Sequence, residues 1–238
     1  MDTVSLSLRE LFQLGGVVMW PLLLFSIAVV AISIERAIYL FYHNLEVNDL
    51  AANVNAYISN KDFQGACEYL NSIKDRRIAA RILHSLLQQV KPGQVFSEHR
   101  AEKAAETEAA NCINSLENGF NFLTALGSLS PLTGFLGTVT GMIGAFRSIA
   151  EATDVNAQIV ANGIYEALIT TVFGLIIAII AMISHSVFSH IVDKFAARVE
   201  GVCSDLIFRF TGMQLENNQP AVIVNTGTQM SEDENKTS

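Results

Sequence analysis

The sequence has few charged residues: 16% of its 238 residues are Asp, Glu, Lys or Arg, whereas an ordinary soluble domain carries about 25%. The charge that is present has the wrong sign for nucleic acid, since 15 Lys and Arg stand against 23 Asp and Glu and the net charge is −8. Nucleic-acid binding requires clustered positive charge facing phosphates. The composition therefore excludes a DNA- or RNA-binding protein.

Motifs for metals, disulfides and nucleotides are also lacking. The cysteines are odd in number and lack the spacing of metal ligands, so neither a disulfide framework nor a zinc site is indicated. His185 and His190 are a pair of histidines only, which is weak support for a metal site. The glycines at 134 and 137 lie in an apolar run with no following Lys, so the Walker pattern fails. We predict no enzyme activity, no cofactor and no metal site. The three cysteines are Cys67, Cys112 and Cys203.

What the sequence does have is three long stretches without charge, and 50% of all residues are hydrophobic. The stretches are 11–34, 118–146 and 167–192. Each exceeds the roughly 20 residues that a helix needs to cross the hydrocarbon core. The first follows Met1 and Asp2 with a single Arg and has full spanning length, which favours an uncleaved anchor over a signal peptide. We predict an all-α integral membrane protein with three transmembrane helices.

The positions of the cations predict the orientation. Arg9 is the one cation before the first stretch, and Arg147 is the one cation between the second and third. The remaining Lys and Arg lie in the loop after the first stretch and after the third, beginning with Lys194 and Arg198. Because cytoplasmic segments carry an excess of cations, the N-terminus is expected outside and the C-terminus in the cytoplasm.

The polar segments are predicted to be helical where apolar residues recur three and four apart. The loop after the first span shows this pattern over 49–58, 61–73 and 75–90. A run from residue 97 continues unbroken into the second span, and the third span continues as an apolar stripe to Phe210. The expected organisation is a periplasmic N-terminus (1–10), a first transmembrane helix (11–40), a cytoplasmic helical loop (41–96), a long helix that includes the second span (97–147), a periplasmic loop (148–164), the third span with its cytoplasmic extension (165–212) and a disordered tail (213–238).

Small residues line one face of each of the last two spans. A face of this kind lets helices approach closely. Thr138, Thr170 and Thr171 add hydroxyl groups, which either serve an ion or bond back to carbonyls of their own helices. No Asp, Glu, Lys or Arg lies inside any span, so a titrating group for proton transport has to come from a second protein. The predicted packing face consists of Gly134, Gly137, Gly141 and Gly144 in the second span and Gly174 and Ala178 in the third.

Three segments together resemble the MotA/TolQ/ExbB proton channel family, most closely its three-span ExbB/TolQ branch. These are Gly15 to Leu22 leading to the Glu35-Arg36 pair, 131–146 with Gly137-Thr138-Val139, and 163–171, which reads GIYEALITT. The resemblance implies an inner-membrane homo-oligomer, a pentameric ring around a pair of single-span ExbD/TolR-like chains that carry a membrane aspartate. It implies that the proton motive force energises TonB-dependent outer-membrane transport through a TonB-like or TolA-like protein.

Site residues carry over by position in the matching segments. Thr138 and Thr171 match the two threonines of the family's pore, and Glu166 matches its acidic residue at the start of the third span. Thr170, beside Thr171, adds a further oxygen. The sequence departs from the family where the third span usually has Pro, replaced by Ile180, and where it often has Tyr-Asn, replaced by His185 and Ser186. Both departures lie toward the cytoplasmic mouth.

Other functions remain open at this point. Within the family, the chain is alternatively a TolQ-like subunit for envelope integrity or a motility stator, and neutral oxygens suit sodium as well as protons. From a different class, a passive membrane scaffold would pack through the same small residues and be indifferent to Thr138 and Thr171. An intramembrane serine protease using Ser128 or Ser130 with His185 is disfavoured, because the nucleophile-elbow pattern is missing.

Overall fold

The structure is a computed structural model that describes residues 12, 15–42, 45–60, 62–90, 96–151 and 157–217. The regular structure in these ranges is α-helical throughout, which confirms the predicted all-α class. Three helical segments are long and apolar enough to cross a membrane, and they contain α2 (Met19–Tyr42), α7 (Phe120–Glu151) and α8 (Ala157–Asn217). The predicted N-terminal segment 1–10 and residues 218–238 of the predicted tail lie outside the described ranges.

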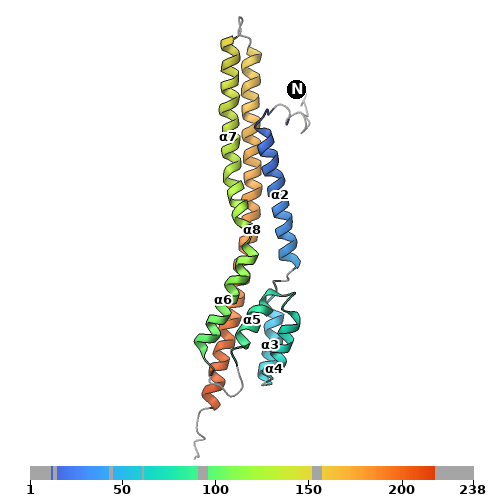
Figure 1. The fold of residues 1–238 in the computed structure, drawn as a ribbon, viewed down its shortest axis with the longest axis vertical. Helices are drawn as coiled ribbons and strands as arrows, with labels where there is room; N and C mark the ends of the chain where they lie inside the picture. Colours follow the sequence, from blue (N-terminus) through green and yellow to red (C-terminus); the bar gives the residue numbers. More distant parts are fainter. Residues whose placement is uncertain are drawn as a thin grey trace, which may run out of the picture.

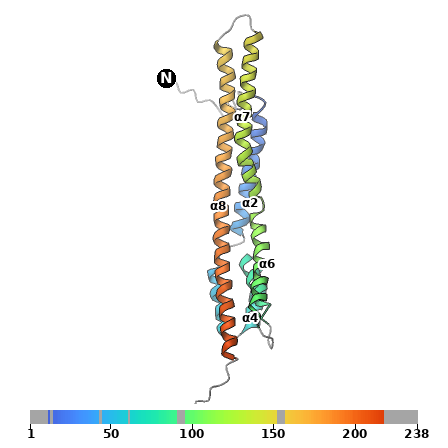
Figure 2. The ribbon, with the colours of Figure 1, turned by 90° about the vertical axis from the view of Figure 1, so that its left-hand side faces the viewer.

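The helices α7 and α8 form an antiparallel pair that stays side by side in both views (Figure 1, Figure 2). The shorter α2 packs beside them, and its Pro21 falls in the first turn, where the missing N–H costs no helical hydrogen bond. The buried contact among the three consists of apolar side chains from all of them. These are Met19, Leu22, Val29, Leu123, Ile169, Ile177 and Ala181.

Below α7, the described part of the chain has four shorter helices: α3 (Asn48–Ser59), α4 (Phe63–Ile73), α5 (Ile78–Leu87) and α6 (Glu98–Glu117). Helices of 10 to 12 residues such as α3, α4 and α5 are marginal alone in water. They are stabilised by one shared apolar core with α6 and the second half of α8, and we call this unit the helical bundle. Its fully buried members include Leu50, Ile58, Leu70, Leu83, Leu86, Leu116 and Leu206.

The expected single helix over 97–147 is two helices in the structure. The helix α6 ends at Glu117 and α7 begins at Phe120, with Asn118 and Gly119 between them. Gly119 has φ +89°, in the left-handed region that favours glycine, so the helical hydrogen-bond ladder stops there. The membrane pair therefore joins the helical bundle through one break, whereas α8 continues through both without interruption.

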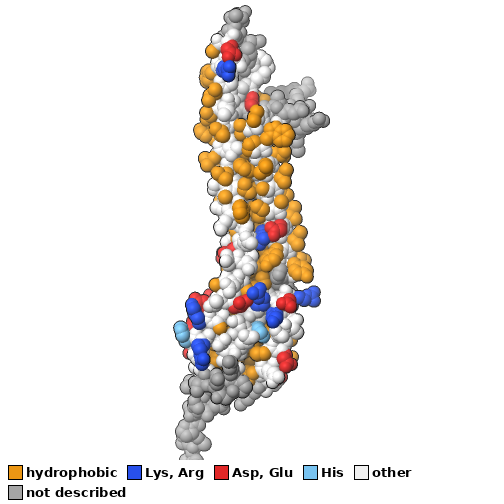
Figure 3. All heavy atoms as spheres, viewed as in Figure 1, with side chains coloured by type: hydrophobic (Ala, Val, Ile, Leu, Met, Phe, Trp, Pro, Cys, Tyr) orange, Lys and Arg blue, Asp and Glu red, His pale blue; other side chains and the backbone are white. Residues whose placement is uncertain are grey.

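The outer surface of the upper part is apolar. Figure 3 shows a band of hydrophobic side chains over α2, α7 and α8, with charged side chains above and below it. Large members of the band are well exposed, among them Leu24, Phe135 and Ile179 at 65%, 63% and 58%. Exposure of this extent indicates a surface that lipid or further membrane helices cover.

Candidate functional site

The backbones of α7 and α8 come into direct contact at two glycines. A Cβ placed on Gly134 would lie 2.8 Å from the carbonyl oxygen of Thr170 and 3.0 Å from the Cα of Thr171. A Cβ on Gly174 would lie 2.6 Å from the carbonyl oxygen of Ser130. Since both neighbours are backbone atoms, no side-chain movement would make room, and only glycine fits at this crossing.

The other members of the predicted packing face differ in their surroundings. A Cβ on Gly137 would overlap the side chain of Thr170, and one on Gly141 would lie 3.2 Å from the carbonyl oxygen of Gly163. Ala178 is buried. Gly144, in contrast, is exposed and has open space where a Cβ would be. Close packing of α7 against α8 thus runs from Ser130, which faces Gly174, to Ala145, which faces Gly163.

Two of the predicted pathway hydroxyls meet at this crossing. The Thr171 hydroxyl donates to the carbonyl oxygen of Gly134 across the helix pair, at 3.2 Å. The Thr170 hydroxyl lies 2.8 Å from the carbonyl oxygen of Ala167 in its own helix and 3.3 Å from that of Gly134. Thr170 is fully buried, whereas Thr171 is half-buried. Thr171 therefore keeps part of its side chain uncovered within this chain.

Thr138 lies on the facing helix, one residue after Gly137. Its hydroxyl donates to the carbonyl oxygen of Phe135 at 2.6 Å, and its side chain is half-buried. This is the back-bonding that the sequence left open as an alternative. A hydroxyl that donates its hydrogen bond to a carbonyl still has lone pairs that can accept hydrogen bonds. Thr138 and Thr171 thus present neutral hydrogen-bond acceptors, suited to a group that arrives carrying a proton.

Glu166 faces a different neighbour from the threonines. Its carboxylate lies directly against Gly16, where φ is +66° and a Cβ would overlap the Glu166 side chain. Gly16 precedes the first turn of α2, and the N-terminus of a helix carries partial positive charge. The structure thus places Glu166 between α8 and the start of α2. It lies apart from the Thr170 and Thr171 hydroxyls, which face the Gly134 carbonyl.

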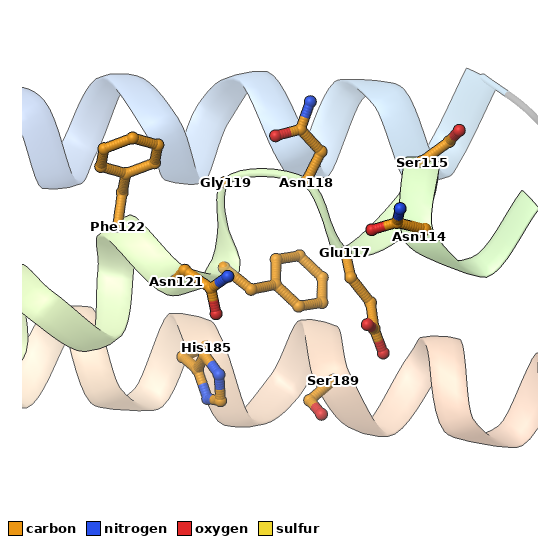
Figure 4. Close-up of a pocket in the computed structure, with 10 residues that line it drawn as sticks. Asn114, Ser115, Glu117, Asn118, Gly119, Asn121, Phe122, His185 and Ser189 are labelled. Atoms are coloured by element: carbon orange, nitrogen blue, oxygen red, sulfur yellow. The ribbon is translucent and has the colours of Figure 1, made fainter. Parts of the chain in front are cut away.

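A second polar feature, a cavity of about 550 Å³, opens where α6 breaks from α7. In Figure 4, Glu117 and Asn121 point toward α8, on which His185 and Ser189 lie. The His185 ring packs edge-on against Phe120, with the ring centroids 5.9 Å apart. Sequence reasoning considered His185 but missed this cavity, although the Asn118-Gly119 dipeptide is a recognised break signal.

Arg36 was also missed as a structural residue. It is 8% exposed, its guanidinium donates to Glu35 at 2.6 Å, and it lies over the Tyr39 ring at 5.3 Å from the centroid. Its Nε would be 3.5 Å from a Cβ on Gly119. The end of the first span is thereby packed onto the break between α6 and α7. The sequence signal was the position of Arg36 at the end of an apolar run.

The described parts of the three spans contain no Asp, Glu, Lys or Arg between residues 19–34, 120–146 and 167–192. The oxygens at the α7–α8 crossing are therefore neutral. Hydroxyl and carbonyl oxygens can accept a hydrogen bond from an acid or coordinate a hard cation, but they do not titrate near neutral pH. The site is able to receive an ion or an acid and is not able to supply the acid itself.

Comparison with known proteins gives consistent similarities. Residues 74–201 match the model of the MotA/TolQ/ExbB proton channel family. The chain is 34% identical to a putative biopolymer transport protein ExbB-like 3 of Synechocystis over 73% of this chain and 81% of that protein. It is 26% identical to biopolymer transport protein exbB1 of Vibrio cholerae over 92% of this chain and 95% of that protein. It is 40% identical to the Tol-Pal system protein TolQ of Haemophilus influenzae over 43% of this chain and 45% of that protein.

Proposed function

The chain belongs to the MotA/TolQ/ExbB proton channel family, and on this premise we propose that it is the ring-forming subunit of a proton-driven motor. As a member of this family with three spanning helices, it is a multi-pass protein of the bacterial inner membrane. Its role is to surround a single-span partner of the ExbD/TolR type, which carries the titrating carboxylate. The motor passes its work to a TonB-like protein that energises outer-membrane transport.

The observation that carries this proposal is the neutral, hydroxyl-bearing crossing of α7 and α8 within spans free of charge. A partner carboxylate that has taken up a proton would donate a hydrogen bond to Thr138 or Thr171, whose oxygens are free to accept. Deprotonation would reverse the preference, because a carboxylate only accepts. Each charge that crosses the membrane field supplies about 2.3 kcal/mol per 100 mV, which is enough to shift such contacts.

A reconstituted complex tests this function. We expect the complex captured through this chain, with its single-span partner, to admit protons into liposomes when a membrane potential is imposed. The chain alone should admit none, because it lacks a titrating group within its described spans. Proton entry is followed with an enclosed pH-sensitive dye. Equal proton entry with the chain alone would contradict the proposal that the partner supplies the titrating carboxylate. Flux that requires sodium at constant pH would mean that the motor is sodium-driven.

A Tol-type role is the second candidate, because relatives named TolQ also match this chain, over 43% and 31% of its length. The two branches differ in the protein that receives the work. A TolA-like protein in the captured complex would identify envelope integrity as the role and leave the ion-driven mechanism unchanged.

The proposed orientation places the helical bundle in the cytoplasm, and Cys67 tests it. Burial raises the pKa of all three thiols, to about 11 for Cys112 and about 12 for Cys203, and Cys67 on α4 is the one that is only half-buried. Because the thiolate is the reactive form, a membrane-impermeant maleimide should label Cys67 alone. We expect this labelling in inverted membrane vesicles and not in intact spheroplasts.

Labelling is measured by mass spectrometry, with Cys67→Ser as the control that should abolish it. After denaturation all three cysteines should react. Labelling of Cys67 in spheroplasts would place the helical bundle outside and reverse the proposed orientation.

A further inference from the structure

Three cations without ion-pair partners lie together in the turn between α4 and α5. Lys74, Arg76 and Arg77 occupy four consecutive positions with Asp75, in a chain whose net charge is −8. No ion pair joins any of the three cations to a carboxylate in the part of the chain that the structure describes. The nearby Arg81 differs, because it is paired with Glu108 at 2.7 Å. We call Lys74, Arg76 and Arg77 the basic turn.

The basic turn lies beside the end of the first span. A cavity of about 200 Å³ joins the two, with Tyr39 of α2 on one side and Lys74 on the other. Its remaining lining residues are Asp75, Ile78, Arg81, Cys112 and Ser115. The charge-free part of α2 ends at Glu35, so Tyr39 is at the level where headgroups replace acyl chains. The cavity and the basic turn are therefore expected at the depth of the lipid headgroups.

The outer face of α2 above the basic turn is apolar and exposed. Ile34, Ile38 and Phe41 are 55%, 64% and 91% exposed. Figure 3 shows Lys and Arg side chains directly below the hydrophobic band on this side of the molecule. Acyl chains on α2 and a phosphate at the basic turn are therefore compatible with one lipid molecule.

The charges of the basic turn have the sign that an anion requires. On the neighbouring α5, the pKa of His84 is lowered mainly by burial and further by the charge of Lys74. Lys74 and Asp75 both line the cavity, and Arg76 and Arg77 follow them in the turn, so the turn carries three unpaired cations against one carboxylate. Basic residues next to a transmembrane helix are attracted to anionic lipid, whose phosphate accepts charge-assisted hydrogen bonds.

We propose that the basic turn and the cavity beside Tyr39 bind the headgroup of an anionic phospholipid of the cytoplasmic leaflet. The lipid would hold the end of α2 and the helical bundle at a fixed depth, as a stationary part of the ring requires. The inference rests on the proposed orientation of the chain, which the labelling of Cys67 tests separately. It does not depend on proton transport.

Native mass spectrometry of the purified complex tests the site, with phosphatidylglycerol and phosphatidylcholine of identical acyl chains as probes. We expect the wild type to retain phosphatidylglycerol preferentially. The triple variant Lys74→Gln, Arg76→Gln and Arg77→Gln should lose about tenfold or more of this preference, since each surface cation contributes measurably to anionic-lipid binding. A control with the same change in charge replaces Arg100, Lys103 and Arg209, all exposed on α6 and α8, with Gln.

The outcomes separate the alternatives. An equal loss in the control variant would show a general effect of net charge and overturn the site. The absence of any preference in the wild type would also overturn it, and competition by inorganic phosphate would reassign the cavity to a free anion. Thermal unfolding of each variant is measured in parallel, and the single variant Arg76→Gln, at an exposed turn position, serves if the triple variant does not fold.

Discussion

Replacement of both Thr138 and Thr171 by Val should abolish ion-driven work while the complex still assembles. Valine keeps the branched shape of threonine, and the hydroxyls it removes donate to carbonyls of Phe135 and Gly134. The loss inside the chain is therefore one weak side-chain bond at each position. What disappears is the pair of oxygens that would accept a hydrogen bond from the partner's acid.

The expected effect on the rate is large. A hydrogen bond between a neutral acid and a neutral hydroxyl oxygen contributes about 0.5 to 1.5 kcal/mol, and each 1.36 kcal/mol is a factor of ten in rate. Loss of both bonds should therefore reduce coupled proton flux by about tenfold to a hundredfold. The measurement is dye-reported flux in liposomes, with the amount of assembled complex determined in the same preparation.

Two controls distinguish the oxygen from the shape. Serine at both positions restores the hydroxyls and should restore most of the flux. Thr124→Val removes a hydroxyl that makes the same kind of bond, to the carbonyl of Phe120. Because Thr124 lies away from the α7–α8 crossing at Gly134, this variant should have little effect on the flux. Full activity of the double valine variant would mean that Thr138 and Thr171 are packing residues only, as in a passive scaffold.

Gly134→Val should separate α7 from α8 and prevent stable assembly. The added side chain would meet the backbone of Thr170 and Thr171 at 2.8 and 3.0 Å, and backbone atoms in two packed helices cannot yield without moving a helix. Overpacking a close contact costs about 1 to 3 kcal/mol, sometimes more. Here it would also break the bonds from Thr170 and Thr171 to the Gly134 carbonyl.

Gly144→Val is the matched control, because Gly144 lies on the same helix and has open space around it. We expect it to extract and unfold like the wild type, while Gly134→Val gives little complex and unfolds at a lower temperature. Both are followed by gel filtration after detergent extraction and by thermal unfolding. Identical behaviour of the two variants would contradict the backbone contact at Gly134.

The spans and the helical class could be predicted from the sequence because hydrophobic length is a one-dimensional property. A charge-free stretch long enough to cross a membrane needs no knowledge of its neighbours. The ends were less certain, since α2 begins at Met19 although the apolar run starts at residue 11. The break at Gly119 was missed because its residues lie between two strong helical patterns, where a turn signal is easily discounted.

The site was predictable in its residues but not in their partners. Periodic glycines indicate a packing face, yet spacing alone does not separate Gly134, which touches α8, from Gly144, where an added Cβ would meet nothing. Glu166 and Thr170 are one turn apart on α8, yet Glu166 faces the start of α2 while Thr170 faces α7. Such differences depend on how three helices are rotated about their axes, and a single sequence does not encode this in a readable pattern.

The composition of the native complex shows whether this chain works together with a partner that carries an acid in its span. The complex is captured through this chain from gently solubilised native membranes and analysed by mass spectrometry. We expect several copies of this chain together with a short single-span protein that has an Asp in its span, and a TonB-like protein. Recovery of this chain without any carboxylate-bearing partner would contradict this expectation, because the described spans contain no acid of their own to carry the proton.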